Sequence, residues 1–493
     1  MKVALVNLNL IKVPAIAPYG LDIIGSGLEA AGHEIDVVDL CREDDPILAL
    51  HSYFSSNRPD LVGLTMRNAV DLYFPSYFDL AEKGSFLKSH KALIDIIKGY
   101  AGIERILIGG VGFSVNPHAF LGRLGLRYGV KGPGELVISQ LANALGGKSL
   151  RELAGGAETF VFDGRKNRIQ APVKRKFVDN RWYYEFGGQA AIRTSSGCAM
   201  RCNYCAEPAA AGNSYRRVAV ENTLREIDEL VALGIRDFQT ADSEFNMPLA
   251  HAKDVLRGII SRGYGSDVRF WAYCQPRPFD AEYASLLAKA GFIGVNFGTD
   301  HVDPQALASL GKWYRLSDVE RSTRLCKDNG MVVMHELLFG TPGDEPEKMR
   351  RAIDSILALD PWVLGVSIGL TVLPDTPLGA FFLERRREGR IDSGFYFAGE
   401  PMVDPTFYVD PSFEIPDVFQ ELERSVGRNS SNVMLPAVSS TSSINNQLVN
   451  SDRVRRQLLV EKRKGPSWYH FPPGVGRIPV HGGSTALPLV AAQ

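Results

Sequence analysis

Residues 194–205 read TSSGCAMRCNYC and place three cysteines, Cys198, Cys202 and Cys205, in the spacing C-x3-C-x2-C. Three thiolates on one short loop can hold three irons of a [4Fe–4S] cube, and Gly197 permits the backbone turn. The fourth iron then has no protein ligand and is open to a reactant. Electron-transfer clusters and structural zinc sites both use four protein ligands, so the missing fourth thiol argues against both.

Two alternatives to the open cluster fit the same three cysteines. They could be buried structural thiols, or they could bind zinc together with a distant ligand such as Cys274. The loop sets the cysteines among glycine and polar residues rather than on an apolar face. The sequence therefore favours the open cluster.

The composition is that of an ordinary folded protein. The chain has 493 residues, of which 45% are hydrophobic and 23% charged, and this excludes collagen, coiled coil and wholly disordered chains. The formal net charge of −1 provides no overall attraction to nucleic acid or anionic lipid. Six cysteines are too few for a disulfide scaffold of this length. The longest apolar stretch, residues 361–374, is too short to cross a ~30 Å hydrocarbon layer. We therefore expect a cytoplasmic, reducing location without a membrane span.

Strands and helices alternate on both sides of the cysteine loop, which predicts an α/β protein. Five β-branched runs, at residues 3–6, 35–38, 61–65, 106–108 and 128–130, predict a doubly wound, Rossmann-like domain over residues 1–150. Residues 151–187 are expected to form a linker. Six strand–helix pairs in residues 188–392 predict a partial (βα)6 barrel. Residues 393–493 are expected to be an irregular extension, poorly ordered at 429–450 and after Gly465.

The cysteine loop, with aromatic Tyr204 directly before its last cysteine, resembles the signature of the radical S-adenosylmethionine superfamily. The resemblance implies that the three cysteines bind the cluster and that the open iron binds S-adenosylmethionine, which one electron cleaves to a 5′-deoxyadenosyl radical. It also implies that Tyr204 contacts this cofactor.

Three later segments resemble the same superfamily in the expected order. Residues 239–246, QTADSEFN, include Asp242 and resemble the segment that meets the methionine moiety. Gly340, Pro342 and Gly343 resemble the Gly-Pro-Gly turn after the fifth strand, and residues 373–378 resemble the end of the sixth strand. Relatives often have Gly-x-Glu-Ser after the fourth strand, where residues 297–300 here read FGTD. The resemblance therefore assigns no ribose or carboxylate contact there.

Glycines recur at the strand ends of the first domain, where they let backbone amides approach a flat or anionic ligand. A dinucleotide site is the alternative, yet no G-x-G-x-x-G follows the first strand. The pattern resembles the cobalamin-binding domain of the B12-dependent branch of the superfamily. The resemblance implies that the contacts with cobalamin come from Tyr19, Gly20, Arg67, Gly109, Gly110, Gly112, Gly132, Gly134 and Glu135.

The lower face of the cobalt has no histidine in this interpretation, because the Asp-x-His-x-x-Gly motif of other cobalamin domains is absent. Arg67 follows the third strand and could lie beneath the corrin, where a permanent cation disfavours a further ligand. An ordinary surface arginine is the alternative.

Together the resemblances imply a cobalamin-dependent radical S-adenosylmethionine enzyme, and first of all a C-methyltransferase. It would act on an unactivated carbon of a small-molecule, lipid or peptide substrate, with a [4Fe–4S] cluster, S-adenosylmethionine and methylcobalamin as cofactors. An electron donor such as a flavodoxin or ferredoxin is expected, and nucleic acid is not. Trp271, Tyr273 and Cys274 could face the substrate, but the sequence assigns no catalytic residue beyond the cluster.

Three alternatives remain open. A cyclase or ring-rearranging enzyme would use the same cofactors without delivering a methyl group. Methylthiolation of tRNA resembles a related branch, but that branch has a second cysteine trio in its N-terminal domain, where Cys41 here stands alone. A sensor or electron carrier would hold the cluster without cleaving S-adenosylmethionine.

Overall fold

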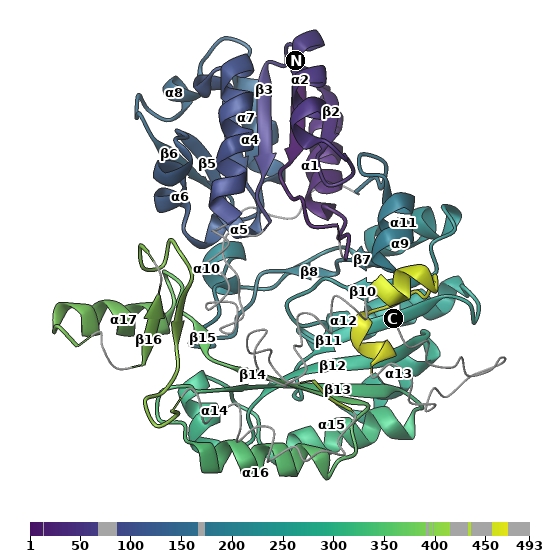
Figure 1. Cartoon of the computed structure of the whole chain (residues 1–493). Coiled ribbons are helices and arrows are strands. Elements are labelled where there is room, and N and C mark those ends of the chain that lie inside the picture. The colour runs from purple at the N-terminus through teal and green to yellow at the C-terminus, as the bar shows by residue number, and fades with distance from the viewer. Residues whose placement is uncertain are drawn as a thin grey trace, which may run out of the picture.

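The computed structural model describes residues 1–12, 14–67, 86–165, 173–390, 394–397, 399–414, 432–434 and 456–471. Two parallel sheets dominate these ranges, and Figure 1 shows the N-terminal sheet above the second one. The α/β class and the two successive parallel-sheet domains predicted from the sequence are confirmed. The domain boundaries at residues 150, 187 and 392 stay a prediction.

The N-terminal sheet has the strand order β2-β1-β3-β4-β5-β6, and all its pairs are parallel. Its strands are β1 (Lys2–Asn7), β2 (Glu34–Asp39), β3 (Leu61–Thr65), β4 (Ile106–Gly109), β5 (Tyr128–Lys131) and β6 (Phe160–Asp163). The connections change direction between β1 and β3. Ligands of doubly wound sheets bind at such a switch point, beyond the carboxyl ends of the strands.

Helices cover both faces of this sheet because alternate residues of β1 point to opposite sides. Val3 and Leu5 pack in the core with α1 (Tyr19–Ala30), α7 (Glu135–Ala144) and α8 (Leu150–Leu153). Ala4 and Val6 pack in the core with α2 (Pro46–Ser56), α4 (Phe86–Ala101) and α6 (Pro117–Leu124). The short α5 (Val111–Val115) and η1 (Ile103–Arg105) flank β4.

The sequence predicted five strands, and the structure adds a sixth. Strand β6 pairs with β5 at the sheet edge, inside the segment that was expected to be a linker. Only the four residues FVFD form it, after Gly155 and Gly156, so the local pattern resembles a loop more than a strand. The same segment also contains α9 (Asn180–Gly187).

The second sheet has the order β18-β14-β13-β12-β11-β10-β7 and is parallel throughout. Its six principal strands are β7 (Ala190–Ile192), β10 (Asp237–Thr240), β11 (Arg269–Cys274), β12 (Phe292–Asp300), β13 (Val332–Phe339) and β14 (Val363–Ile368). The helices between them are α10 (Glu207–Ala211), α11 (Val220–Ala232), α12 (Leu249–Arg262), α13 (Ala281–Lys289), α14 (Pro304–Leu310), α15 (Leu316–Asp328) and α16 (Pro346–Leu357). The predicted succession of six strand–helix pairs is therefore confirmed.

The segments after β14 complete the second domain. A small antiparallel sheet joins β15 (Leu370–Thr371), β16 (Phe395–Phe397) and β17 (Thr406–Tyr408), beside α17 (Pro377–Arg387). Strand β18 (Val433–Met434) pairs with β14.

The 3-10 helix η2 (Ser467–His470) corrects one expectation. Residues after Gly465 were expected to be poorly ordered, yet Trp468 is buried against Trp271, Met334 and Val363. Isolated aromatic residues near a chain end give no local signal of such packing. Residues 472–493, to which the same expectation applied, lie outside the described ranges, as do most of residues 429–450.

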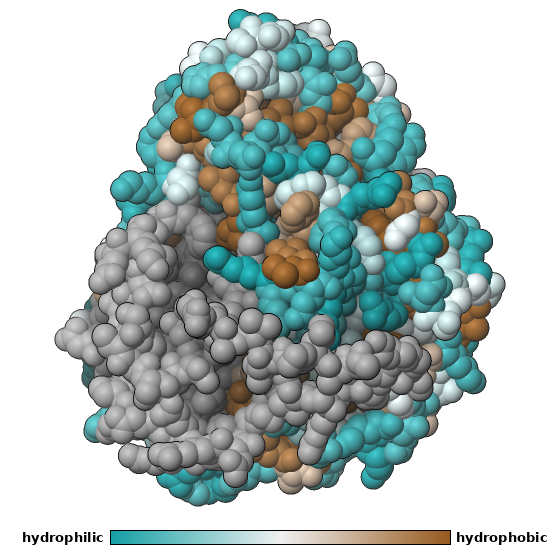
Figure 2. Space-filling view, turned by 45° about the vertical axis from the view of Figure 1, so that its right-hand side comes forward, coloured by the Kyte–Doolittle hydropathy of each residue, from teal (hydrophilic) through white to brown (hydrophobic). Residues whose placement is uncertain are grey.

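Hydrophobic residues on the face drawn in Figure 2 lie in small groups among hydrophilic residues. None of the helices in the described ranges combines the length and the hydropathy that a bilayer crossing requires.

Candidate functional site

The cysteine loop follows β7 and the short β8 (Ser195–Ser196), at the carboxyl end of the second sheet. Gly197 has φ +81° there, and a Cβ atom would lie 2.5 Å from the Ser214 carbonyl oxygen, so only glycine fits. Cys198 and Cys202 are buried and Cys205 is half-buried. The structure thus brings all three predicted ligands to one loop.

Burial raises the pKa of Cys202 to about 11 and that of Cys205 to about 12. These thiols therefore keep their protons until a metal displaces them. Among the residues that the structure describes, no three His, Cys, Asp or Glu side chains are grouped as ligands of one metal ion. A four-iron cube does not need such a grouping, because it would place each thiolate on a different iron.

Asp242 fixes the start of this loop from the end of β10. Its carboxylate accepts hydrogen bonds from the Thr194 backbone N–H at 2.9 Å, the Thr194 hydroxyl at 3.0 Å and the Ser195 backbone N–H. Burial raises the pKa of Asp242 to about 6 although these donors favour the carboxylate. Asp242 therefore positions the loop, and its oxygens are already engaged within the protein.

The C-terminal end of α14 and the glycine after it hold the other end of the loop. The Asn203 backbone N–H donates to the Leu310 carbonyl oxygen at 3.0 Å, and its side-chain amide donates to Ser309 O at 2.8 Å. Gly311 has φ +76°, and a Cβ atom there would lie 2.3 Å from the Arg201 carbonyl oxygen. The two segments are in close backbone contact, so they are positioned together.

Polar side chains gather at the carboxyl ends of β11, β12 and β13. We call the following set the strand-end cluster: Tyr204, Glu244, Tyr273, Gln275, Asn296, Asp300, Lys312 and Glu336. Tyr204 donates to Asp300 at 2.6 Å, and the Lys312 ammonium lies 3.0 Å from the same carboxylate. Burial opposes the charge of Lys312, but Asp300 holds its pKa above the usual value. The residues of the motif FGTD thus join the cysteine loop through Tyr204.

Two further carboxyl groups make the strand-end cluster acidic. Burial raises the pKa of Glu244 to about 8 and that of Glu336 to about 7, and each feels the repulsion of Asp300. Gln275 donates to one oxygen of Glu244, whereas the other oxygen has no partner among the described residues. The side-chain amide oxygen of Asn296 also lacks a hydrogen-bond partner there. Unpaired buried polar atoms are costly, so a polar ligand is expected to bind them.

The Gly340–Gly343 turn follows β13, as its sequence predicted. Gly340 has φ +84°, and its backbone N–H donates to the Asp344 carboxylate at 2.9 Å. Gly343 has φ +81°, and its backbone N–H donates to the Asp410 carboxylate at 2.7 Å. The Pro342 carbonyl oxygen accepts from Ser309 at 2.9 Å. The turn therefore lies beside the segment that holds the cysteine loop.

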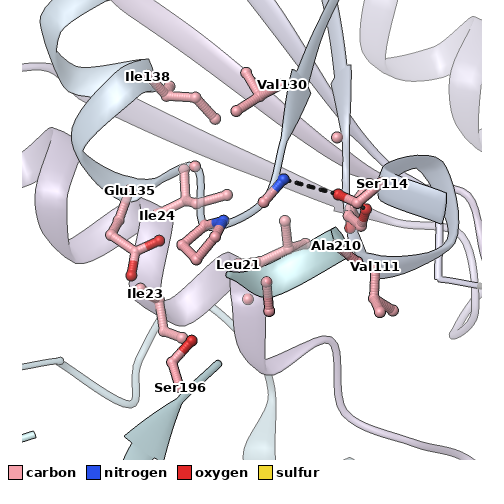
Figure 3. Close-up of a pocket in the computed structure, with 18 of the residues that line it drawn as sticks. Leu21, Ile23, Ile24, Val111, Ser114, Val130, Glu135, Ile138, Ser196 and Ala210 are labelled. Atoms are coloured by element: carbon pink, nitrogen blue, oxygen red, sulfur yellow. Dashed lines mark hydrogen bonds between the residues drawn. The ribbon is translucent and has the colours of Figure 1, made fainter. Parts of the chain in front are cut away.

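A cavity lies between the two domains, and we call it the interdomain cavity (Figure 3). Its N-terminal wall comes from α1 and from the ends of β3, β4 and β5, with the aliphatic residues Leu21, Ile23, Ile24, Val111, Val130 and Ile138. Its other wall comes from the residues beside the cysteine loop, including Ser195, Ser196, Ala210 and Ser243.

Most of the predicted cobalamin contacts line this cavity: Gly20, Gly109, Gly110, Gly132, Gly134 and Glu135. The Gly132 N–H donates to the Ser114 hydroxyl at 2.9 Å, which orders the turn after β5 (Figure 3). The walls are mostly aliphatic or glycine, which suits the apolar faces of a corrin, and no histidine is among the lining residues that the structure describes. Glu135, Arg193, Glu207 and Ser243 provide polar groups for amide side chains at the edge of such a ligand.

For three other residues, the contact with cobalamin stays a prediction. The Tyr19 hydroxyl donates to Glu226 of α11 at 2.7 Å, and the Arg175 guanidinium stacks 4.3 Å from its ring, so Tyr19 joins the two domains. Gly112 donates its N–H to the Met66 carbonyl oxygen at 3.0 Å. The charge of Arg67 favours the thiolate of nearby Cys41, but burial has the larger effect, so the pKa of the thiol is raised overall. None of the three is among the cavity-lining residues that the structure describes.

Sequence reasoning missed Glu336, Asn296 and Lys312. The one available signal was a glutamate inside the apolar run of β13, VVMHELLF, where a buried carboxyl group needs a reason. Lys312 gives no such signal, because its partner Asp300 is on a different element.

Comparison with known proteins matches residues 192–356 to the model of the radical SAM superfamily. The chain is 37% identical over 443 residues to tryptophan 2-C-methyltransferase of Streptomyces laurentii, which covers 76% of this chain and 73% of that protein.

Solved structures give the same result. The radical S-adenosylmethionine methyltransferase TsrM of Kitasatospora setae, with tryptophan and an S-adenosylmethionine analogue bound, is similar with a TM-score of 0.84 and 34% identity, over 95% of this chain and 97% of that one. A second TsrM structure holds cobalamin and a [4Fe–4S] cluster, with a TM-score of 0.84 and 32% identity over 95% and 96% of the two chains. The cobalamin-dependent enzyme OxsB shares the fold, with a TM-score of 0.64 and 16% identity over 86% and 67%.

Proposed function

Because this chain belongs to the cobalamin-dependent radical S-adenosylmethionine methyltransferases, we propose that it methylates carbon 2 of the indole ring of tryptophan or of a close analogue. Its cofactors are a [4Fe–4S] cluster, S-adenosylmethionine and cobalamin, and its substrate is a small molecule. Similarity to a tryptophan methyltransferase over most of both chains carries the proposal. The cyclase alternative is not favoured, because the two relatives that are more than 30% identical to this chain are methyltransferases.

We propose the following roles for the residues of the site. Cys198, Cys202 and Cys205 bind the cluster, and the glycines of the interdomain cavity, with Glu135, bind cobalamin. When bound, cobalamin carries the methyl group and the cluster supplies electrons. The cavity reaches the residues next to Cys198, which supports a cobalamin that faces the cluster region. Tyr204 and the Gly340–Gly343 turn remain candidates for contacts with S-adenosylmethionine, and Asp242 positions the loop.

The strand-end cluster supports an amine-bearing substrate. It contains three carboxyl groups and one ammonium group, so a cationic amine is favoured there over a further anion. We propose that the α-ammonium group of the substrate binds Glu336, next to the side-chain amide oxygen of Asn296, which lacks a partner in the described structure. Glu336 and Asn296 would then favour amino acids over indoles that lack an amino group.

Anaerobic incubation of reconstituted protein with cobalamin, reductant, S-adenosylmethionine and tryptophan tests the reaction. We expect mass spectrometry to detect methylated tryptophan and S-adenosylhomocysteine in equal amounts. The Cys202→Ala variant should bind no iron and form neither product. Cys326→Ala changes a buried cysteine of α15 outside the loop, so this variant should still bind iron and form both products. Failure of tryptophan and its ring-substituted analogues to be methylated would contradict the proposed substrate.

Glu336→Gln tests the role of the carboxyl group. We expect the KM for tryptophan to rise by at least about tenfold, as for a lost charge-assisted hydrogen bond, while the Kd for S-adenosylmethionine stays within about twofold. The wild type should discriminate against indole-3-propionate, which lacks the amine, and the variant should not. An unchanged KM, or a loss confined to S-adenosylmethionine binding, would contradict this assignment.

We further propose a small electron-carrier protein, a flavodoxin or a ferredoxin, as the source of the electrons that the cluster needs. Comparison of a flavodoxin with a chemical reductant in the same assay tests this donor directly.

A further inference from the structure

An exposed tryptophan touches the cysteine loop. Trp313 has 43% of its surface accessible, in the segment between α14 and α15. Its indole N–H points to the Met200 sulfur at 3.2 Å, and Met200 is a buried residue between Cys198 and Cys202. One side chain therefore reaches from solvent to the middle of the ligand loop.

The contact is held firmly. Gly311, two residues before Trp313, packs against the backbone of Arg201 and Cys202, and Asn203 is bonded to Ser309 and Leu310. A protein that touches Trp313 would thus approach the cysteine loop closely. Short distance is what electron transfer between two proteins requires.

Arginines surround this tryptophan. The Arg277 guanidinium lies 5.0 Å from the Trp313 ring centroid, and its side chain is 49% exposed. Arg277 also lies 4.0 Å from Asp318, which pairs with exposed Arg321 at 2.8 Å. Arg201 of the loop and Arg315 before α15 are exposed as well.

A groove continues from Arg277 between α12, α13 and α15. Its lining comprises Leu249, Arg277, Pro278, Phe279, Asp280, Ala281, Arg321, Arg324 and Leu325. The lining contains three arginines and one carboxylate, and Asp280 is already paired with Lys253 at 2.7 Å. The groove therefore presents positive charge to an approaching protein.

We propose that Trp313 and this arginine groove form the docking surface for a small acidic electron-carrier protein such as a flavodoxin. The proposal rests on the proposed function, which includes a protein electron donor. Charge complementarity decides the occupant, because the whole chain carries no net basic charge that would explain a local excess of arginine. Tryptophan, arginine and methionine are also the residue types enriched at protein interfaces.

The redox step needs no further reactant. One electron leaves the donor, whose flavin hydroquinone is oxidised to the semiquinone, and one electron reduces the oxidised cluster. No bond is formed or broken between the two proteins. Trp313 and Met200 serve as the contact through which the donor comes near, and neither is oxidised.

The test uses reconstituted holoenzyme and a bacterial flavodoxin reduced to its hydroquinone. Binding is measured by titration and cluster reduction by stopped-flow absorbance, so neither readout needs the methylation substrate. Arg277→Gln/Arg321→Gln/Arg324→Gln should raise the Kd for flavodoxin at least about tenfold and slow reduction similarly at low salt. In the wild type, the reduction rate should fall steeply as salt rises from about 20 mM to about 300 mM.

Two further variants keep the test decisive if the triple variant folds poorly. Arg324→Glu alone leaves the Asp318 ion pairs intact and should weaken binding, and Trp313→Ala should do so without a change in charge. Arg386→Gln/Arg387→Gln/Arg390→Gln removes three exposed arginines on and after α17, on the other side of the molecule in Figure 1, and should have no effect.

Reduction by dithionite, which needs no docking surface, distinguishes a loss of docking from damage to the cluster or the fold. We expect all variants to be reduced by dithionite at the wild-type rate. Equal slowing with flavodoxin and dithionite, or wild-type binding of flavodoxin by the groove variants, would overturn the docking surface. Groove variants that lose binding of transfer RNA instead of flavodoxin would also overturn it. If flavodoxin and ferredoxin both fail to reduce the wild type while dithionite succeeds, the protein donor of the proposed function is wrong.

Discussion

At the scale of single residues, Gly110 leaves no space for a side chain. It has φ +101°, and a Cβ atom would lie 2.5 Å from the Met66 carbonyl oxygen, at the wall of the interdomain cavity. Gly110→Ala should therefore displace the end of β3, lower the free energy of unfolding by about 1–3 kcal/mol and weaken cobalamin retention.

Denaturant unfolding and the corrinoid retained after gel filtration measure both effects. Gly99→Ala is the matched control, because that residue lies inside α4 and nothing would touch its Cβ atom. It should stabilise the protein by about 0.5–1 kcal/mol and leave cobalamin in place. Equal behaviour of the two variants would contradict the role of Gly110.

His335 predicts a pH dependence of stability. Its two ring nitrogens meet the hydroxyls of Thr299 at 2.7 Å and Thr323 at 2.9 Å, and burial lowers its pKa to about 3. In the unfolded chain the ring titrates near 6.5, so between about pH 6.5 and 3 the unfolded state binds more protons. Stability must fall as pH drops through that window, by up to about 1.4 kcal/mol per pH unit.

Chemical denaturation of the cofactor-free protein between about pH 7 and pH 5 checks this slope. His335→Gln should be less stable throughout but show a flatter dependence on pH than the wild type. His118→Gln, at an exposed histidine, should retain the wild-type slope. A His335→Gln variant with an unchanged slope would refute the assignment.

Single residues also show how far sequence reasoning reaches. The three cysteines could be assigned because their spacing already contains the geometry of a cluster. Glu336 and Lys312 could not, since a buried charge is recognised by its partners, and theirs come from other elements. The position of Arg67 beneath the corrin stays a prediction, because its effect on the Cys41 thiol does not test a contact with cobalamin.

At the scale of elements, η2 packs against the amino-terminal ends of the central strands of the second sheet. Trp468 packs on Trp271, and a Cβ atom on Gly294 would lie 2.8 Å from the Trp468 ring. Trp362 donates its indole N–H to the Tyr469 carbonyl oxygen at 3.0 Å. Trp468→Ala should leave a cavity and destabilise the second domain by about 3–5 kcal/mol.

Thermal and denaturant unfolding test this prediction. Val460→Ala serves as the control, because that residue lies in the same segment and is 83% exposed, and its effect should stay within about 0.5 kcal/mol. If Trp468→Ala lowers the free energy of unfolding no more than the control does, η2 does not stabilise the sheet.

The regular elements were predictable and the irregular ones were not. Strands β1, β3, β4 and β5 lie within one residue of their predicted bounds, because buried parallel strands have continuous apolar runs. Strand β6 and helix η2 are short, and they are defined by what they pair with or pack against. Neither kind of contact can be read from a local pattern.

At the scale of the whole molecule, one buried ion network joins the two domains. The Arg175 side chain is fully buried, 3.2 Å from Asp22 of α1 and 3.4 Å from Glu226 of α11. Arg175→Met would leave both carboxyl groups buried without their cation. We expect a loss of about 3–5 kcal/mol in the free energy of unfolding.

Denaturant unfolding followed separately in each domain measures this loss. Lys174→Met is the control, because that side chain is 56% exposed and pairs with Glu29 on the surface, so it should change stability by less than about 1 kcal/mol. Adding Asp22→Asn and Glu226→Gln to Arg175→Met should restore part of the stability. Equal losses in the control and in Arg175→Met would contradict the network.

The arrangement of the domains was beyond the sequence. Tyr19, Asp22 and Arg175 are far apart in the chain from Glu226, and nothing in their local patterns indicates contact. The topology of each domain follows from its periodicity, whereas the interface depends on side chains that meet only after both have folded.

The interdomain cavity has a wall from each domain, so a corrinoid that binds there, as we propose, would hold the two domains together. Binding energy gained from both walls adds to the free energy that keeps the halves together. A cell that neither makes nor imports vitamin B12 should therefore accumulate a looser chain that proteases remove sooner. Nutrient supply, and not gene expression alone, then governs how much of this enzyme persists.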